Sequence, residues 1–411
     1  MATYMLAGEE VDSIELKCMV VSRGMTVDKA VYKAFKPRAR LSESPLNCNC
    51  MILADGTIVQ LTDMGFHLNQ VKSMFSLSTL KMMKYAKDLT SPFKLELVDG
   101  EPTITYEGTP VTTVRFPEKN AFYEQTTRAG LPYAGNAVLQ GVDWVAFQCL
   151  WPCEFGAAGK PCEFCYSGGE FAALARKGKP MPPAVPVADF TEIVTYALDE
   201  CGVNSIQITG GSTFDGRAEA EHIRAYLTAL RDDVGLERFA DGDILLYITP
   251  PADLALIDEY FELGATRIAC SLELWDEERA ATVTPGKIAF TTRQRHLDAL
   301  EYIAEHYGKN KAFSNFIIGI ESLETLEEGA RYLASRGIIP TASTWMPQGA
   351  PVMGSMKAPD VAYYRKVKEL FGQLYVEYGL EPAGGCGLNV CTERDIWRAA
   401  TGACPPRTAL A

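Results

Sequence analysis

Short apolar runs alternate with amphipathic segments along residues 140–350. The apolar runs predict six strands, at 144–148, 205–209, 245–249, 267–273, 314–320 and 339–345. Between them, segments such as DFTEIVTYALDEC and RHLDALEYIAEHY place apolar residues at i, i+3 and i+4, which predicts helices. Alternating strands and helices indicate a parallel sheet with right-handed crossovers. Six such units predict an α/β fold built on a partial (βα)6 TIM-like barrel.

Residues 1–135 follow a different pattern, in which strand-like runs are separated by turns. SIELKCMVVS resembles a strand, and two further segments resemble hairpins that turn at Asp55-Gly56 and Asp99-Gly100. This pattern predicts an N-terminal α+β domain over 1–135, followed by the barrel domain over 136–350. The remaining residues, 351–411, are expected to form a long helix from about 360 to 378 and a Cys-containing C-terminal tail.

Composition narrows the classes of protein that fit. Hydrophobic residues make up 47% of the 411 positions, enough for a large core. No apolar run approaches the ~20 residues of a membrane span, and the N-terminus shows no secretion signal. The formal charge of −13, from 39 basic and 52 acidic residues, argues against nucleic acid as the main partner and favours a small molecule.

The twelve cysteines predict metal binding in a reducing compartment, the cytoplasm. Cys149, Cys153, Cys162 and Cys165 follow the first predicted barrel strand. In Cys162-Glu163-Phe164-Cys165, two sulfurs three positions apart can reach one metal centre, either zinc or iron–sulfur. Zinc usually has a second pair of similar spacing, so a catalytic cluster with three protein ligands is favoured over a zinc knuckle or free thiols.

The first ligand is expected to be Cys153, with Cys149 as the alternative. Cys149 lies at the end of the predicted strand, whereas a sulfur needs a few loop residues to reach over the mouth of the barrel. The segment EFGAAGKP between Cys153 and Cys162 is rich in Gly and Pro and can loop out without separating the sulfurs.

These motifs resemble the radical S-adenosylmethionine (SAM) superfamily, and in particular its biotin synthase-like branch, over roughly residues 140–350. The resemblance lies in CEFC, in TGGST after the second strand, in CSLE on the fourth, in FTTRQR, in FIIGIES on the fifth and in WMPQG after the sixth. The C-x8-C-x2-C spacing departs from the family, since most members have three residues in the first gap. That departure concerns the choice of ligands more than the family.

The resemblance implies a [4Fe-4S] cluster and SAM as cofactors, in an oxygen-sensitive enzyme. The cluster would supply one electron that cleaves SAM to a 5′-deoxyadenosyl radical, which removes hydrogen from carbon. The implied cluster ligands are Cys153, Cys162 and Cys165. The implied SAM contacts are Phe164, Gly210, Gly211, Ser212, Ser271, Glu273, either Arg293 or Arg295 for the carboxylate, and Ile318 beside the adenine. Ser167-Gly168-Gly169-Glu170 also resembles the glycine motif but is expected to open a helix.

The tail cysteines Cys386, Cys391 and Cys404 have three possible roles. They can hold a second iron–sulfur cluster, bind a structural metal together with Cys48 or Cys50, or remain free thiols. Tyr166, Asn315, Trp345 and Gln348 stand at predicted strand ends and are candidates for lining a substrate cavity.

The expected function is radical C–H functionalisation of a small molecule or cofactor precursor. Such an enzyme needs an electron donor such as flavodoxin or ferredoxin, and no membrane partner is expected. One alternative is a radical SAM enzyme that modifies a peptide or protein. The other is a zinc-stabilised barrel scaffold without enzymatic activity.

Overall fold

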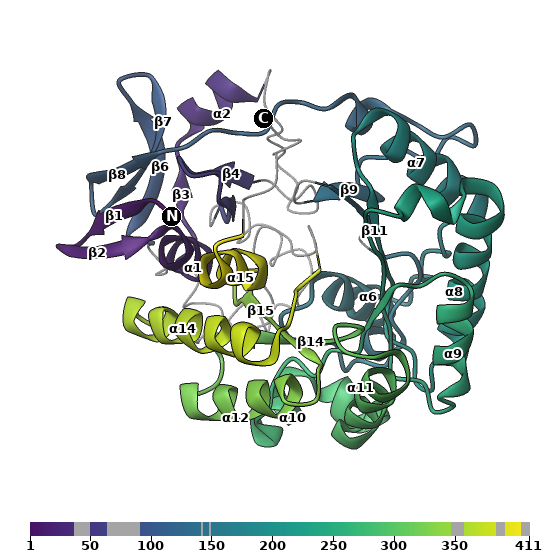
Figure 1. The fold of residues 1–411 in the computed structure, drawn as a ribbon. Helices are drawn as coiled ribbons and strands as arrows, with labels where there is room; N and C mark the ends of the chain where they lie inside the picture. The colour runs from purple at the N-terminus through teal and green to yellow at the C-terminus, as the bar shows by residue number, and fades with distance from the viewer. Residues whose placement is uncertain are drawn as a thin grey trace.

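The computed structural model describes residues 1–36, 50–63, 91–140, 143–147, 149–346, 357–383 and 391–403, apart from the side chains of Tyr166 and Glu170. Its centre is a curled seven-stranded sheet in the order β15-β14-β13-β12-β11-β10-β9 (Figure 1). The strands are β9 Ala137–Gln140, β10 Trp144–Phe147, β11 Ser205–Thr209, β12 Ile244–Tyr247, β13 Arg267–Ala269, β14 Ala312–Ile318 and β15 Ile339–Thr344. Strands β10 to β15 are parallel, which confirms the partial barrel.

β9 was not predicted, and it pairs antiparallel with β10 at one edge of the sheet. The main helices cover the outer face of the sheet, as Figure 1 shows. They are α7 Val187–Glu200, α8 Arg217–Ala229, α9 Ala255–Glu262, α11 Arg293–Tyr307, α12 Leu323–Ala334 and α14 Val361–Tyr378. The shorter elements are α5 Glu154–Ala157, α6 Tyr166–Arg176, η4 Leu230–Val234, η5 Leu236–Phe239, α10 Glu277–Val283 and the π-helical turn η6 Lys287–Thr291.

Alternation along the strands separates two faces of the sheet. On β14, Phe316 and Ile318 belong to the main core, which also contains residues of the covering helices. Asn315 and Ile317 project to the opposite, inner face. The inner face therefore carries the polar positions, and the site is expected there, at the carboxyl ends of the strands.

The N-terminal region forms small sheets and two helices, at the left of Figure 1. Its elements are β1 Thr3–Leu6, β2 Glu9–Asp12, α1 Ser13–Arg23, β3 Thr26–Val27, α2 Lys29–Phe35, β4 Cys50–Ile52, β5 Ile58–Gln60, β6 Phe93–Val98, β7 Glu101–Tyr106, β8 Thr109–Thr113 and η3 Ala121–Glu124. The hairpins β4–β5 and β6–β7 turn at Asp55-Gly56 and Asp99-Gly100, as predicted. The domain boundaries at 135 and 350 stay a prediction.

The strand predicted for SIELKCMVVS is wrong, because these residues form α1. Asp12 caps the helix: its side chain accepts from the amides of Ile14 and Glu15, and Glu15 accepts in turn from the Asp12 amide. Residues 13–22 are all buried, so the helix lacks the polar face by which an amphipathic helix is recognised.

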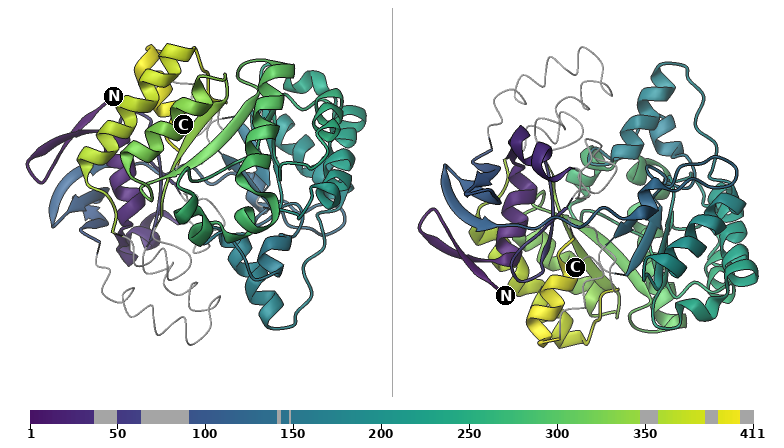
Figure 2. Two further views of the ribbon diagram at one scale, coloured as in Figure 1. Left: turned by 90° about the horizontal axis from the view of Figure 1, so that it is seen from below. Right: turned by 90° about the horizontal axis from the view of Figure 1, so that it is seen from above.

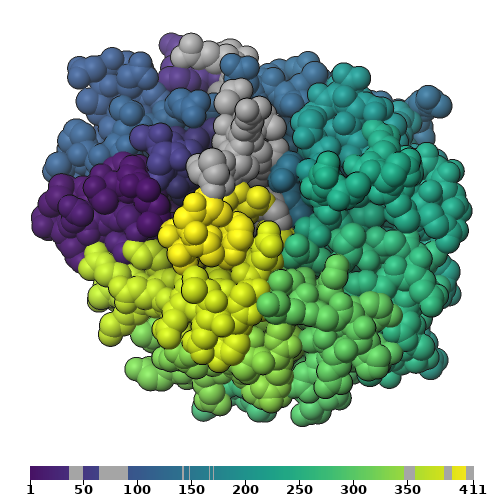
Figure 3. Space-filling model, in the orientation of Figure 1, coloured from purple at the N-terminus to yellow at the C-terminus, as the bar shows by residue number. Residues whose placement is uncertain are grey.

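The C-terminal segment closes one edge of the barrel. Cys391 pairs with Ser343 of β15, and the Thr392 amide donates to the Ala342 carbonyl over 2.8 Å. The helix α15 Glu393–Thr401 follows. In Figure 3 this yellow segment lies between the purple N-terminal residues and the green and teal barrel. In the described part of the chain, no helix has the length and apolar character needed to cross a membrane.

Candidate functional site

The chain that follows β10 extends along the carboxyl end of β11. The Gly211 amide donates to the Trp151 carbonyl over 2.8 Å, and the Glu154 amide donates to the Ser212 carbonyl over 2.9 Å. The Trp151 indole donates in turn to the Gly211 carbonyl over 2.8 Å. These bonds hold Cys153 against the end of β11, so the cysteine loop and the glycine motif form one unit.

Gly210 and Gly211 are required by the packing of this unit. A Cβ at Gly210 would lie 2.1 Å from the Trp151 ring, and one at Gly211 would lie 2.1 Å from the backbone nitrogen of Cys153. No larger residue fits without displacing the cysteine loop. The expected contact of Gly210, Gly211 and the half-buried Ser212 with the amino group of SAM stays a prediction.

Three cysteines gather between β10 and α6. Cys153 caps α5, and its Sγ accepts from the Gly156 amide over 3.4 Å. Cys165 caps α6, and its Sγ accepts from the Gly168 amide over 3.3 Å. Burial raises the pKa of all three thiols, that of Cys165 to about 11, and the charges of neighbouring thiolates raise the pKa of Cys162 further. The three sulfurs therefore lie within electrostatic reach of one another.

The long gap between the first two cysteines is taken up by α5. Gly156 packs so closely on α6 that a Cβ there would lie 2.7 Å from the Gly168 carbonyl oxygen. This contact between α5 and α6 brings their capping residues, Cys153 and Cys165, to one place despite the eight-residue insertion.

Cys149 contacts the backbone of the loop and lies near α8. Its thiol donates to the Trp151 carbonyl over 2.9 Å, and its charge acts on Tyr226 of α8. The arrangement supports Cys153 as the first of three ligands, although ligation itself stays a prediction.

The chemistry of the three thiols is compatible with an iron–sulfur cluster. Among the described residues, no three Cys, His, Asp or Glu side chains converge as ligands of a single metal ion do. In a [4Fe-4S] cluster each cysteine binds a different iron, so its ligands need not converge on one point. The three thiols lie on one loop, and two of them accept hydrogen bonds from backbone amides, as sulfurs that ligate a cluster can.

A buried ion pair extends from the end of β13. Glu273 has a left-handed backbone, with φ +72°, and its Oε1 lies 2.8 Å from Lys287 Nζ. Lys287 Nζ also donates to the Ser271 carbonyl over 2.5 Å, and Asn315 Nδ2 donates to Glu273 Oε2 over 2.8 Å. The charge of Lys287 lowers the pKa of Cys162 against the larger effect of burial. Lys287 thus links Ser271 and Glu273 to the surroundings of Cys162, and the contact of Ser271 and Glu273 with SAM stays a prediction.

The two candidate arginines have different surroundings. Arg293 stacks on Trp275, with its guanidinium carbon 3.7 Å from the ring centroid, and donates to the Trp275 carbonyl. Arg295 donates through Nη1 to the Phe214 carbonyl over 3.2 Å, just beyond the glycine motif. Its Nε and Nη2 are buried and find no hydrogen-bond partner within the described ranges. Burial lowers the pKa of Arg295. Arg295 is therefore the arginine of the two with buried donors that have no hydrogen-bond partner among the described residues.

The predicted apolar contacts with SAM are split between two clusters. Phe164 packs against a small cluster that includes Ile317 and Trp345. Ile318 lies in the main core at 1% exposure. The structure thus brings Phe164 and Ile317 together and leaves Ile318 on the outer face of the sheet.

Other predicted positions have separate fates. Ser167, Gly168 and Gly169 lie in the first turn of α6, as expected. Cys391 Sγ lies 3.0 Å from Ser343 Oγ at the edge of the barrel. Cys48, Gln348, Cys386 and Cys404 lie outside the described residues, so a second cluster in the tail stays a prediction.

Two residues that no motif marks also belong to this region. Lys287 follows no recognisable pattern and is found only through its contacts with Ser271 and Glu273. Glu219 lies on α8 at 1% exposure and accepts from Thr213 Oγ1 over 3.1 Å and from the Thr249 amide over 2.7 Å. Burial raises the pKa of Glu219 to about 8. On a helix with a mixed sequence, nothing distinguishes it from a surface glutamate.

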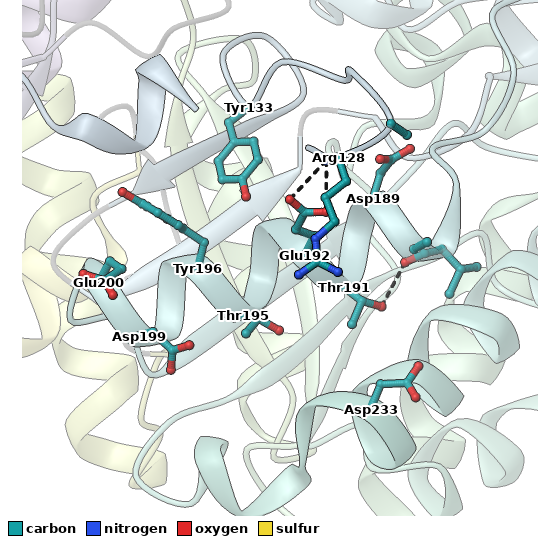
Figure 4. A pocket seen from close by; sticks show the side chains of 13 residues that line it. Arg128, Tyr133, Asp189, Thr191, Glu192, Thr195, Tyr196, Asp199, Glu200 and Asp233 are labelled. Atoms are coloured by element: carbon teal, nitrogen blue, oxygen red, sulfur yellow. Dashed lines mark hydrogen bonds between the residues drawn. The ribbon is translucent and has the colours of Figure 1, made fainter. Parts of the chain in front are cut away.

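A groove of about 740 Å³ lies elsewhere, between α7 and the loop that contains Arg128 and Tyr133 (Figure 4). Glu192 of α7 accepts from the Arg128 amide, and Tyr196 packs edge-on against Tyr133. Because α7 covers the outer face of the sheet, this groove is separate from the cysteine loop. Figure 2 shows that α6 and the segment that follows it project from the body of the barrel.

The chain is similar to known proteins in the following respects. Residues 153–333 match the family model of the Radical SAM superfamily. A bacteriochlorophyllide c C-7(1)-hydroxylase from Chlorobaculum limnaeum is 21% identical over 289 residues, which cover 68% of this chain and 72% of that protein. The crystal structure of methylornithine synthase (PylB) is 16% identical, with a TM-score of 0.39, over 67% of this chain and 86% of that chain.

Proposed function

This chain belongs to the radical SAM superfamily, and we propose that it functionalises a C–H bond of a small molecule or cofactor precursor. The superfamily implies a [4Fe-4S] cluster and SAM, which when bound supply a 5′-deoxyadenosyl radical that removes hydrogen from unactivated carbon. The match to an enzyme superfamily disfavours the alternative of a zinc-stabilised barrel scaffold without enzymatic activity.

In this proposal Cys153, Cys162 and Cys165 hold the cluster and leave one iron open to SAM. The glycine motif at Gly210 and Gly211 presents backbone next to the cysteine loop. The carbonyl of Gly211 is occupied by the Trp151 indole, so the contacts left for an amino group come from other atoms of the motif. The three cysteines are half-buried, whereas residues 157–160 of the loop between them are exposed.

The observation that carries the proposal is the pair of buried donors on Arg295. A buried guanidinium nitrogen without a partner costs about 1–3 kcal/mol, more when the group is charged. A ligand carboxylate relieves this cost, because its two oxygens match two nitrogens of the guanidinium. Arg295 bonds the Phe214 carbonyl, so this carboxylate would lie beside the segment that follows the glycine motif.

The closed edge of β15 supports a small molecule over a polypeptide as the substrate. A polypeptide commonly binds by adding a strand to an exposed sheet edge. Here Cys391 and Thr392 already pair with that edge, and Lys17 Nζ donates to the Cys391 carbonyl over 2.6 Å. We further place the enzyme in the cytoplasm, with flavodoxin or ferredoxin as its reductant.

The first test is anaerobic. The protein is reconstituted with iron and sulfide, reduced with dithionite and mixed with SAM, and 5′-deoxyadenosine is measured together with bound iron. We expect both to be lost in Cys153→Ser, Cys162→Ser and Cys165→Ser and retained in the matched control Cys149→Ser. Loss in Cys149→Ser with retention in Cys153→Ser would reverse the ligand assignment. A stoichiometric zinc ion without iron would overturn the function.

The substrate class is tested with an extract of the source organism, divided into a low-molecular-mass filtrate and the retained proteins. We expect the filtrate to stimulate SAM cleavage by the wild-type enzyme. Stimulation by the retained proteins alone would instead favour a peptide or protein substrate.

A further inference from the structure

Lys287 projects from an unusual turn of the backbone. It opens η6, a π-helical turn, and such turns are rare and frequent at functional sites. The turn ends before Thr292, a β-branched residue with φ +59°. A β-branched residue rarely adopts this conformation, so the surrounding packing must hold it. Inside the turn, Thr291 Oγ1 donates to the Lys287 carbonyl over 2.8 Å.

Both hydrogen bonds from the Lys287 ammonium reach the same short segment. Lys287 Nζ donates to the Ser271 carbonyl over 2.5 Å and to Glu273 Oε1 over 2.8 Å. Residues 271–273 follow β13, and Glu273 has φ +72°, a conformation uncommon for glutamate. One ammonium thus holds the backbone before Glu273 and its side chain together.

The ion pair is shielded from water. The side chains of Lys287 and Glu273 are 13% and 11% exposed. Burial lowers the pKa of Lys287, but the charge and hydrogen bond of Glu273 together with the charges of Cys162 and Cys165 outweigh it and raise that pKa above its ordinary value. Loss of either partner would leave a buried charge without compensation, which is costly.

Glu273 keeps free acceptor capacity in this arrangement. Lys287 donates to its Oε1 and Asn315 Nδ2 donates to its Oε2, over 2.8 Å each. Each carboxylate oxygen has two acceptor sites, so one on each oxygen is left. Two adjacent hydroxyl groups of a ribose can donate to those sites.

We propose that Lys287 is a positioning residue, which fixes the Glu273 carboxylate so that it accepts hydrogen bonds from the ribose of SAM. Lys287 itself does not contact the ribose in this proposal. The inference rests on the proposed function, since it assumes that SAM binds beside the cysteine loop. Lys287 is a residue that no sequence motif identifies.

The test is a double-mutant cycle with reconstituted enzyme, measuring the Kd of SAM by anaerobic titration and the cluster spectrum by electron paramagnetic resonance. Lys287→Met is expected to weaken SAM binding about tenfold or more, while the iron content stays at the wild-type level. Glu273→Gln is expected to weaken it similarly. The double variant should bind SAM no more weakly than the weaker of the two single variants, because each single substitution already removes the Lys287–Glu273 ion pair. Lys287→Arg should restore part of the affinity.

Lys366→Met is the matched control, because Lys366 is exposed on α14, which contributes no residue to the cysteine loop or the glycine motif. It should bind SAM like the wild type. Equal Kd values for Lys287→Met and wild type, or additive effects in the double variant, would overturn the positioning role alone. Failure of the wild-type enzyme to bind SAM would instead overturn the proposed function. If Lys287→Met loses iron, the cycle is measured between Lys287→Arg and Glu273→Gln, and additivity there overturns the role.

Discussion

Arg293 and Arg295 are two positions apart in the sequence but have different surroundings in the structure. Arg293 and Arg295 lie in the first turn of α11, where successive side chains point in different directions. Arg293 stacks on Trp275, whereas Arg295 reaches Phe214 with two donors unpaired. The run FTTRQR indicates that an arginine is available but does not distinguish the two.

The contrast leads to a prediction at the residue scale. Arg295→Ala should weaken SAM binding by about tenfold to a hundredfold, because the carboxylate loses a two-point partner. Arg293→Ala should leave the Kd within about threefold and lower the free energy of unfolding by about 0.5–2 kcal/mol through loss of the stacked Trp275 contact. Anaerobic titration and urea denaturation measure the two effects, and a larger Kd change for Arg293→Ala would contradict the assignment.

Between elements, Glu219 joins the ends of two strands. Its carboxyl accepts from Thr213 Oγ1 after β11 and from the Thr249 amide after β12, and the Thr213 amide donates to Thr249 Oγ1 over 3.1 Å. The first turn of α8 therefore fixes the distance between the glycine motif and the next strand. The buried carboxyl has its pKa raised to about 8.

This raised pKa predicts how stability depends on pH. In the folded state Glu219 keeps its proton up to about pH 8, whereas the unfolded chain loses it near the ordinary value of 4.5. The folded state binds more protons in this window, so the free energy of unfolding should fall as pH rises from about 5 to 8, by on the order of 2–4 kcal/mol from this group.

Glu219→Gln keeps an acceptor for the Thr249 amide without the ionisation, and its side-chain NH2 can donate to Thr213 Oγ1, which reverses the direction of that hydrogen bond. Urea denaturation at several pH values should show a flatter dependence for this variant than for the wild type. Parallel curves for the two proteins would show that Glu219 does not titrate in this range. Glu219→Ala should be less stable than either, because it leaves the Thr249 amide buried without its acceptor.

Across the whole molecule, ion pairs fasten the N-terminal helix α1 to the C-terminal elements. Glu15 bonds Arg365 and Lys368 of α14, over 3.2 and 2.6 Å. Lys17 bonds Asp395 of α15 over 2.8 Å. The α15 helix begins directly after the tail residues that pair with β15, so α1, the tail and the barrel edge form one connected assembly.

Acid should weaken the ion pairs that join α1 to α14. Burial raises the pKa of Glu15, but hydrogen bonds from Arg365 and Lys368 outweigh it and lower that pKa. A carboxyl with a lowered folded pKa contributes stability above its unfolded value, about 4.3, which is lost as pH falls through the folded value. As pH falls below about 4.5, the free energy of unfolding should therefore drop more steeply in the wild type than in Glu15→Gln. Chemical denaturation across this range measures the difference, and equal slopes would contradict it.

The sequence by itself determined the barrel, because buried parallel strands and amphipathic helices leave periodic patterns that local reading detects. It also located the cysteine loop and the glycine motif, since metal ligands and close backbone approach require particular residue types in sequence. It failed at α1, where a helix buried on all sides looks like an apolar strand, and at β9, a short edge strand.

Only the tertiary structure decided which side chains meet. It separated Arg295 from Arg293 and Ile317 from Ile318, and it placed the Cys149 thiol against the Trp151 carbonyl. It also revealed Lys287, whose partners lie 14 and 16 positions away. These choices depend on the angles at which helices and loops pack on the sheet, and packing angles are set by the sum of many contacts distant in sequence. No local pattern encodes them.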